Sequence, residues 1–266
     1  MTLKAVLFDF NGVIIDDEPL HERLMRELLI HENMRPDPQE VNQVCLGRSD
    51  RACLRDLLER RGRVVGDADI ERLLAIKTAA YQAEIVQMER LPIYPGLEDL
   101  VYKCRIANLK LAVVTGARRE EVEIVLERAK LREYFAVVVS SDDVPASKPE
   151  PNGYLLAVEM LRQVFPELDL RPENCLAIED TFVGIEAAKR AAISVVGVAH
   201  TYPFHMIQRQ ANWTVDYLND LELERVQQVL AGCSEPGEGT TSPPSPGQPL
   251  VRCEESQAET TSQAEG

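Results

Sequence analysis

The sequence is short of positive charge. It contains 29 Lys and Arg residues against 44 Asp and Glu, so its formal net charge is −15 at pH 7. Proteins that bind the phosphate backbone of nucleic acids usually carry basic surfaces, and this charge balance argues against that function class. We interpret the short basic pairs in the chain as solvated helix faces, and we expect no nucleic-acid partner.

Long apolar runs and closely paired cysteines are also missing. No run of 18 apolar residues occurs, and the first residues hold no long apolar segment, so we expect neither membrane spanning nor secretion. The six cysteines show no C-x-x-C spacing, which gives no zinc motif and predicts reduced thiols in a cytoplasmic protein. The 266 residues, 45% of them apolar, are enough for one or two globular domains with a substantial core.

Short apolar segments of strand length recur along the chain. They are apolar throughout rather than alternating, which predicts parallel strands buried on both faces. The segments are residues 5–8, 111–115, 136–140, 176–179 and 195–198. Helical stretches at residues 120–132, 153–164 and 182–192 separate the last four. This alternation predicts an α/β fold with a doubly wound parallel sheet.

The first two predicted strands are separated by about a hundred residues, which is too many for a simple crossover. Apolar spacings of three and four predict helices there, over residues 19–31, 38–46, 51–61 and 69–89. We predict that residues 17–90 form a helical cap domain inserted into a core domain of residues 1–16 and 91–232. Residues 233–266 are rich in Ser, Pro, Gly and Glu without any aromatic residue, which predicts a disordered acidic tail.

Polar residues stand at the ends of the predicted strands. These are Asp9 after the first strand, Thr115 and Gly116 at the second, Lys148 in the loop after the third, and Glu179 and Asp180 at the fourth. Taken singly, such residues are often helix caps, turns or solvated pairs. In an open parallel sheet, however, these strand ends share one edge. The combination therefore predicts that the residues meet in one cleft.

In this order, the motifs resemble those of the haloacid dehalogenase-like (HAD) hydrolase superfamily. The resemblance is carried by DFNGV at residues 9–13, TG at 115–116, KPEP at 148–151 and IED at 178–180. The helical insertion, and the sequence GVIIDDE at residues 12–18 followed by His21, are similar to the branch with a C1 cap. That branch includes β-phosphoglucomutase and phosphoglycolate phosphatase. The likeness covers residues 3–230.

The resemblance implies a magnesium-dependent phosphatase that forms an aspartyl-phosphate intermediate. Asp9 would be the nucleophile, and Lys148 would neutralise charge on both Asp9 and the phosphoryl group. Mg²⁺ would be held by Asp9, Asp180 and the main-chain carbonyl of Asn11. Glu179 would be either a further ligand or an anchor behind the metal.

The resemblance also assigns substrate contacts. Thr115 and the amide of Gly116 would bind the phosphoryl oxygens. His21 stands where the family has a polar residue at the entry to the cap, and the alternative is a histidine on an ordinary helix face. Apart from the resemblance, Arg48 lies in the turn between two predicted cap helices. Its planar guanidinium could bind a phosphate or carboxylate, or it could equally be a surface charge. The expected partner is a small phosphorylated metabolite, and the expected assembly is a monomer or a weak homodimer.

Asn11 departs from the family pattern. Family phosphatases have an aspartic acid there, which protonates the leaving group and later activates water. An amide cannot transfer a proton in this way, and losing a general acid–base typically costs about 10²–10⁴-fold in rate. The departure leaves three interpretations open.

The first interpretation is a phosphatase that is slow, or that acts on esters with good leaving groups. The second is chemistry at carbon, as in a dehalogenase that uses the same Asp nucleophile. The metal-binding form of Glu179 and Asp180 argues against a dehalogenase, which needs no metal. A phosphonatase also acts without the second Asp but needs a Schiff-base lysine from the cap, and Lys77, within a predicted helix, does not match that role. The third is a catalytically impaired protein that binds phosphorylated ligands.

Overall fold

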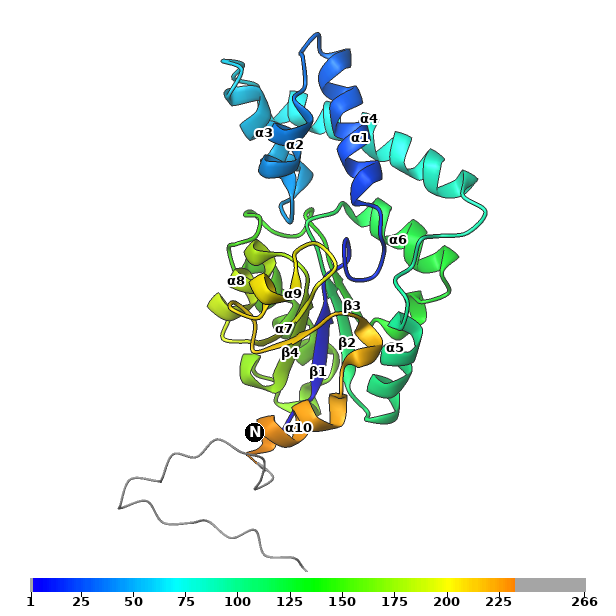
Figure 1. Ribbon diagram of the computed structural model, residues 1–266, viewed down its shortest axis with the longest axis vertical. Coiled ribbons are helices and arrows are strands. Elements are labelled where there is room, and N and C mark those ends of the chain that lie inside the picture. The colour runs from blue at the N-terminus through cyan, green and yellow to red at the C-terminus, as the bar shows by residue number, and fades with distance from the viewer. Residues whose placement is uncertain (1, 233–266) are drawn as a thin grey trace, which may run out of the picture. The chain divides into compact units, whose positions relative to one another are not determined.

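The computed structural model describes residues 2–232, and its centre is a six-stranded parallel sheet (Figure 1). The strands lie in the order β3-β2-β1-β4-β5-β6, and neighbouring strands all run parallel. Their bounds are β1 (Ala5–Phe8), β2 (Lys110–Val114), β3 (Val137–Val139), β4 (Cys175–Glu179), β5 (Ser194–Val198) and β6 (Trp213–Val215). The α/β fold predicted from the strand pattern is therefore confirmed.

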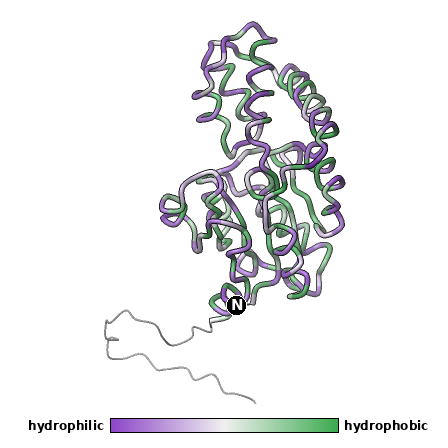
Figure 2. Tube along the Cα trace, turned by 45° about the vertical axis from the view of Figure 1, so that its right-hand side comes forward, coloured by the Kyte–Doolittle hydropathy of each residue, from purple (hydrophilic) through white to green (hydrophobic). Residues whose placement is uncertain are grey.

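Helices cover both faces of this sheet. On one face lie α5 (Leu97–Ile106), α6 (Arg119–Arg128) and α10 (Leu223–Ala231), and on the other α7 (Asn152–Val164), α8 (Phe182–Arg190) and α9 (Phe204–Ile207). Val6 and Phe8 of β1 pack with the first group, and Ala5 and Leu7 pack with the second. The strands are apolar throughout because both of their faces are buried. Figure 2 shows hydrophobic segments running through the centre of the core.

Four helices are inserted between β1 and α5, as the apolar spacing predicts (Figure 1). They are α1 (Glu18–His31), α2 (Pro38–Cys45), α3 (Asp50–Glu59) and α4 (Asp67–Gln87), each within two residues of its predicted bounds. Buried side chains such as Met25, Leu29, Leu54, Leu57 and Leu73 give these helices a hydrophobic cluster of their own. The described residues nevertheless form one compact unit, so the division into core and cap domains stays a prediction.

The cysteines correct one expectation. Cys45, at the end of α2, and Cys53, in α3, form a disulfide with their Cα atoms 4.8 Å apart. A turn of four residues folds the two helices back on each other, and this tertiary proximity is invisible in a search for C-x-x-C spacing. Cys104 and Cys175 are free and buried, as structural thiols are expected to be.

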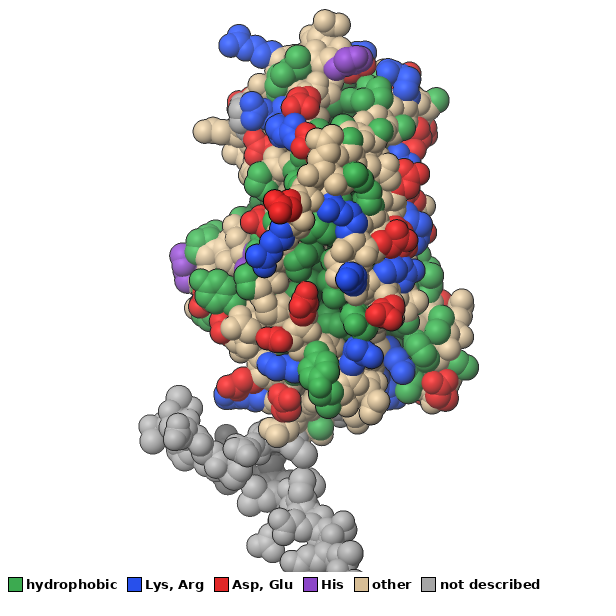
Figure 3. Space-filling model, turned by 90° about the vertical axis from the view of Figure 1, so that its right-hand side faces the viewer, with side chains coloured by type: hydrophobic (Ala, Val, Ile, Leu, Met, Phe, Trp, Pro, Cys, Tyr) green, Lys and Arg blue, Asp and Glu red, His purple; other side chains and the backbone are tan. Residues whose placement is uncertain are grey.

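Three further expectations concern membranes, charge and the tail. Within residues 2–232, no helix is both long and apolar enough to cross a membrane. On the face shown in Figure 3, basic side chains are interspersed with acidic ones and do not gather into one basic surface. The predicted tail, residues 233–266, lies outside the described residues.

Candidate active site

The carboxyl ends of β1, β2 and β4 lie next to one another in the sheet and place their polar residues at one edge. Asp9 directly follows β1, Thr115 follows β2, and Asp180 follows β4. All three side chains are buried. The sheet hydrogen bonds continue into these residues, because the Asp9 amide donates to the Ile178 carbonyl at 3.0 Å and the Thr115 amide to the Val139 carbonyl at 3.0 Å.

Lys148 joins two of the carboxylates at this edge. Its Nζ lies 2.9 Å from Asp9 Oδ1 and donates to Glu179 Oε1 at 2.6 Å, and the Tyr154 hydroxyl donates to the same Glu179 oxygen at 2.5 Å. Burial by itself lowers the pKa of Lys148, but the carboxylates of Asp9 and Glu179 outweigh burial and raise it. The ammonium therefore stays charged at neutral pH, beside the carboxylate that sequence motifs assign as the nucleophile.

Three carboxylates crowd together around Lys148. Asp9, Glu179 and Asp180 each offer an oxygen within 4.8 Å of the other two. Burial, followed by repulsion from Asp9, raises the pKa of Glu179 to about 8 and that of Asp180 well above its ordinary value. Both raised pKa values show that the ionised carboxylates repel one another, because the single ammonium of Lys148 does not balance their negative charge.

Two oxygens of the cluster have no hydrogen-bond donor. Among the described residues, nothing donates to Glu179 Oε2 or Asp180 Oδ1, and both atoms are buried. Buried carboxylate oxygens without a donor are costly unless a cation meets them. Oxygen ligands of this kind suit Mg²⁺, so the residues present fit the metal that sequence motifs predict. Thr201 fixes the other oxygen of Asp180 by donating its hydroxyl hydrogen bond to Oδ2.

Two glycines make room for these carboxylates. Gly12 has a φ of +77°, and a Cβ there would lie 1.9 Å from Asp180 Oδ2. At Gly184, in the first turn of α8, a Cβ would lie 2.0 Å from Glu179 Oε2. The side chain of Thr181 caps this helix by accepting a hydrogen bond from the Gly184 amide at 3.2 Å. Both positions therefore require glycine, because a side chain at either one would collide with a carboxylate of the cluster.

We expect Gly184→Ala to lower the free energy of unfolding by about 1–3 kcal/mol, the usual cost of overpacking. The added methyl group must displace the Glu179 carboxylate, which Lys148 and Tyr154 hold from the other side. Urea unfolding followed by circular dichroism measures the change. Gly66→Ala is the matched control, since a Cβ at Gly66 meets no atom within 4 Å. Equal stability of Gly184→Ala and wild type would show that Glu179 is not confined as described.

Asn11 is held by a buried carboxylate from the start of the insertion. Its Nδ2 donates to Asp17 Oδ1 at 2.9 Å, and the Tyr81 hydroxyl donates to Asp17 Oδ2 at 2.5 Å. Burial raises the pKa of Asp17, but the adjacent His21 and the hydrogen bonds from His21, Tyr81 and Asn11 outweigh burial and lower it. The amide nitrogen of Asn11 is therefore occupied by its hydrogen bond to Asp17. The side-chain oxygen Oδ1 of Asn11 is the polar atom that remains for a ligand in the cleft.

His21 is part of the same network. Its Nδ1 lies 2.7 Å from Lys77 Nζ, and its Nε2 lies 3.2 Å from Asp17 Oδ2. Because an ammonium can only donate, we assign Nδ1 as the acceptor and place the proton on Nε2, where it reaches Asp17. Asn11 Nδ2 is 3.1 Å from the same Nε2, so His21 lies directly beside the residue that departs from the family pattern.

Lys77 extends the network to α3 and α6. Its Nζ donates to Asp50 Oδ2 at 2.6 Å and lies 3.5 Å from Glu121 Oε1, and all three residues are away from the exposed surface. His21, Asp50 and Glu121 also have the spacing of a metal-binding group. The ammonium of Lys77 contacts each of these three residues, however, so it supplies the positive charge that a metal ion would bring.

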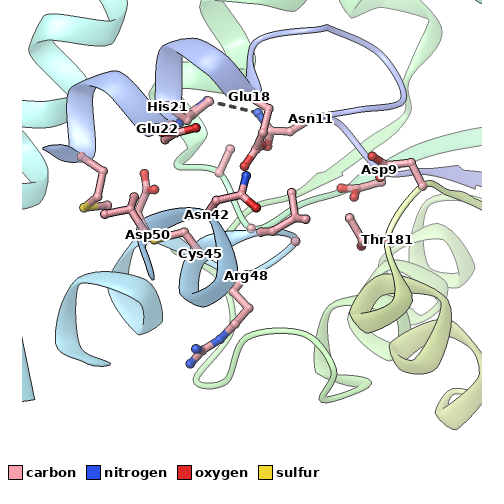
Figure 4. Close-up of a pocket in the computed structure, with 17 residues that line it drawn as sticks. Asp9, Asn11, Glu18, His21, Glu22, Asn42, Cys45, Arg48, Asp50 and Thr181 are labelled. Atoms are coloured by element: carbon pink, nitrogen blue, oxygen red, sulfur yellow. Dashed lines mark hydrogen bonds between the residues drawn. The ribbon is translucent and has the colours of Figure 1, made fainter. Parts of the chain in front are cut away.

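Arg48 lies near the site but turns its charge away from it. Its Nη1 donates to Asp56 Oδ2 at 2.7 Å and to the Val44 carbonyl at 3.1 Å, and Figure 4 shows the guanidinium directed away from Asp9. The backbone of the same turn rests on the core, because Ser49 N donates to Ser147 Oγ at 2.7 Å. A Cβ at Gly116 would lie 3.0 Å from Ser49 N, so glycine permits this close approach.

The structure places the predicted site residues along two adjoining pockets. One is lined by Asp9, Asn11, His21, Arg48, Gly116 and Asp180, and the other by Arg48, Thr115, Gly116 and Lys148. Glu179 lies behind them, fully buried. Sequence reasoning missed Asp17, Tyr154 and Thr201. Asp17 had a signal, because it belongs to the GVIIDDE segment, whereas nothing in the sequence points to the other two.

Comparison with known proteins identifies the family that this chain resembles. A family model described as haloacid dehalogenase-like hydrolase matches residues 3–192. The phosphorylated carbohydrates phosphatase of Thermotoga maritima is 31% identical over 200 residues, which are 75% of this chain and 87% of that protein.

Solved structures show the same architecture. A mutant of CbbY from Rhodobacter sphaeroides, in complex with xylulose-1,5-bisphosphate, has a TM-score of 0.67 and 27% identity, over 83% of this chain and 96% of that one. For β-phosphoglucomutase from Clostridium difficile, the TM-score is 0.72 with 24% identity, over 86% and 98% of the two chains. The second likeness concerns the fold alone.

Proposed function

Because the chain belongs to the haloacid dehalogenase-like hydrolase family, we propose that it is a magnesium-dependent phosphatase of a small phosphorylated metabolite. The observation that carries the proposal is the pairing of Asp9 with Lys148 at 2.9 Å, inside a carboxylate cluster with two buried oxygens that lack donors. The phosphatase from Thermotoga maritima supports phosphorylated carbohydrates as the substrate class.

Asp9 would act as the nucleophile through one of its two oxygens. Oδ1 is oriented by the Phe10 amide, which donates to it at 2.7 Å, and by Lys148. Oδ2 is therefore the oxygen that we assign to attack on phosphorus, which gives an aspartyl-phosphate. Lys148, Thr115 and the Gly116 amide would then stabilise the negative charge on the phosphoryl oxygens.

Mg²⁺ would be held by Asp9, Asp180 and the main-chain carbonyl of Asn11, with Glu179 behind them. When bound, the ion supplies the positive charge that lets a phosphate group approach the Asp9 carboxylate. The hydroxyl of Thr201 and the ammonium of Lys148 keep two of these carboxylates in place. Their role would be to fix the ligands, and the Asp180 oxygen that lacks a donor would be available to the cation.

We further propose that Asn11 makes proton transfer the weak step. Its Nδ2 donates to Asp17, and an amide has no proton to exchange with a leaving alkoxide. Esters whose alcohol leaves without protonation would therefore react faster than alkyl phosphates. Capture by Asp9 and stabilisation by Lys148 do not depend on Asn11, so hydrolysis is slowed and not lost.

The test uses esters that do not need a general acid. We expect purified protein to hydrolyse p-nitrophenyl phosphate and acetyl phosphate in the presence of Mg²⁺, to lose this activity with EDTA, and to regain it when excess Mg²⁺ is added. Release of p-nitrophenolate and of inorganic phosphate measures the two reactions. Absence of turnover on both esters, in protein that unfolds cooperatively, would contradict the proposal.

One alternative also follows from Asn11, namely a catalytically impaired protein that binds phosphorylated ligands. The same experiment separates the two functions. Stabilisation by Mg²⁺ with inorganic phosphate, without hydrolysis of any ester, would favour the binding protein. A dehalogenase-type activity would instead release halide from a 2-haloacid in EDTA, where the phosphatase is inactive.

A further inference from the structure

The pocket that opens at Asp9 and Asn11 continues between α1 and α2 of the insertion (Figure 4). By the proposed function the core would bind the phosphoryl group at the strand ends. Of the two adjoining pockets, this is the one lined by both Asp9 and Asn11, so we assign it to the alcohol esterified to that group. Carboxylates line it on both sides, namely Glu18 and Glu22 from α1 and Asp50 from α3. Asn42 of α2 faces the same space, and Figure 4 shows its side chain pointing toward Glu18.

The basic groups around this space are already neutralised. Among the described residues that line the pocket, Arg48 and His21 are the basic ones. Arg48 donates to Asp56 and to a backbone carbonyl, and it is directed away from Asp9. His21 Nδ1 accepts a hydrogen bond from Lys77, whose ammonium is itself shared between Asp50 and Glu121. No cation of this lining is left to meet an anionic group on the ligand.

Among the described residues, Glu18 makes no ion pair and Glu22 pairs with Arg26 alone, whereas Asp50 lies 2.6 Å from the Lys77 ammonium. The nearest ion pair of Glu22 is with Arg26, at 3.7 Å and near the surface. Burial, as the largest cause, raises the pKa of Glu18 to about 6, so its carboxylate is still ionised at pH 7.5. The other side chains of the pocket include Met25, Val41 and Leu46, which offer apolar contact only. The lining thus offers a ligand negatively charged hydrogen-bond acceptors together with an apolar surface.

We infer that the alcohol portion of the substrate is uncharged or cationic, and that it carries no second phosphate and no carboxylate. An anionic group there would face the carboxylates of Glu18 and Glu22 with no unpaired cation of the described lining to meet it, whereas hydroxyl or ammonium groups would donate hydrogen bonds to them. This inference rests on the proposed phosphatase function and narrows its substrate class. It sets this protein apart from the CbbY relative, whose bound ligand is a bisphosphate.

Three esters that differ only in one terminal group test the inference. They are phosphoethanolamine, which is cationic, ethylene glycol monophosphate, which is neutral, and 2-phosphoglycolate, which is anionic. At pH 7.5 in saturating Mg²⁺, we expect kcat/KM for the first two to exceed that for 2-phosphoglycolate by about tenfold or more, because one like charge within a few ångströms of a carboxylate has an effect of this order. We likewise expect kcat/KM to be higher for a hexose monophosphate than for the corresponding bisphosphate.

Charge-neutral variants locate the source of the selectivity. The double substitution Glu18→Gln and Glu22→Gln should bring the neutral-to-anionic ratio of kcat/KM close to one, since it keeps the shape of the two side chains and removes their charge. Glu27→Gln is the matched control. Glu27 lies on the same helix, is exposed and pairs with Arg23 at 3.1 Å, so its removal should leave the ratio unchanged.

The outcomes separate this inference from the proposed function. If 2-phosphoglycolate or the bisphosphate reacts as fast as its neutral counterpart, the inference is wrong and the phosphatase function stands. If no ester is hydrolysed, the function fails, and dissociation constants measured by calorimetry with Mg²⁺ still test the charge preference. The wild-type protein serves for that measurement, because it does not turn the esters over in this case. Equal binding of the three esters would overturn the inference.

Discussion

Replacing Asp9 with asparagine is expected to reduce the turnover of p-nitrophenyl phosphate by about 10⁴-fold or more, as removal of a catalytic nucleophile does in other hydrolases. The amide matches the carboxylate in size but cannot form an acyl phosphate. It can still accept the hydrogen bond from Phe10, and its oxygen can still face Lys148. The loss is therefore expected without loss of the fold.

A steady-state assay in saturating Mg²⁺ measures this effect, together with a thermal unfolding curve for each protein. Asp169→Asn is the control for the chemical change, because Asp169 lies at the surface in the left-handed region (φ of 42°), where asparagine is well tolerated. That control should keep the wild-type rate. Retention of Mg²⁺-dependent turnover by Asp9→Asn would show that the nucleophile has been assigned to the wrong residue.

Replacing Asn11 with aspartic acid should produce the largest gain. We expect kcat/KM for alkyl phosphates to rise by about 10²–10⁴-fold, the usual contribution of a positioned general acid–base. The new carboxyl group would take the place of an amide that lies 2.9 Å from Asp17 Oδ1. Two carboxyl groups this close cannot both ionise easily, so the new acid would have a raised pKa and would hold the proton that the leaving alkoxide needs.

The dependence on the leaving group makes this prediction specific. The rate with p-nitrophenyl phosphate should change far less than the rate with ethylene glycol monophosphate, since p-nitrophenolate leaves without protonation. Asn42→Asp is the matched control, because it adds an acid to the same pocket on α2 and should not accelerate the alkyl ester. No increase in either rate for a folded Asn11→Asp protein would mean that proton transfer does not limit the reaction.

Much of the site could be predicted because its residues stand at strand ends. Asp9, Thr115 and Asp180 follow strands that are apolar throughout, and a parallel sheet brings such ends to one edge whatever the sequence between them. The insertion could be predicted for a similar reason, since spacings of three and four are local properties of each helix. Helix α5 was not predicted, although it packs beside β1 and β2.

Contacts between side chains could not be predicted in the same way. Arg48 was expected to contact the substrate, which stays a prediction, but its guanidinium donates to Asp56, eight residues away on α3, and this partner was not foreseen. Cys45 and Cys53 were expected to be reduced, and the α2–α3 turn brings them into a disulfide. In both cases the outcome depends on how two helices pack, which periodicity does not specify.

The α/β fold, the helical insertion and the order of the motifs can be recognised from the amino-acid sequence, because they follow from hydrophobic periodicity and from short local segments. The placement of the charges depends on tertiary packing. Asp17, just before α1, and Lys77 and Tyr81, both in α4, meet around Asn11 and His21, and within the part of the chain that the structure describes the same packing leaves Glu18 without an ion pair and Glu22 with Arg26 alone. The electrostatic character of the pocket is a sum over residues that are distant in sequence, and it exists only once they are brought together.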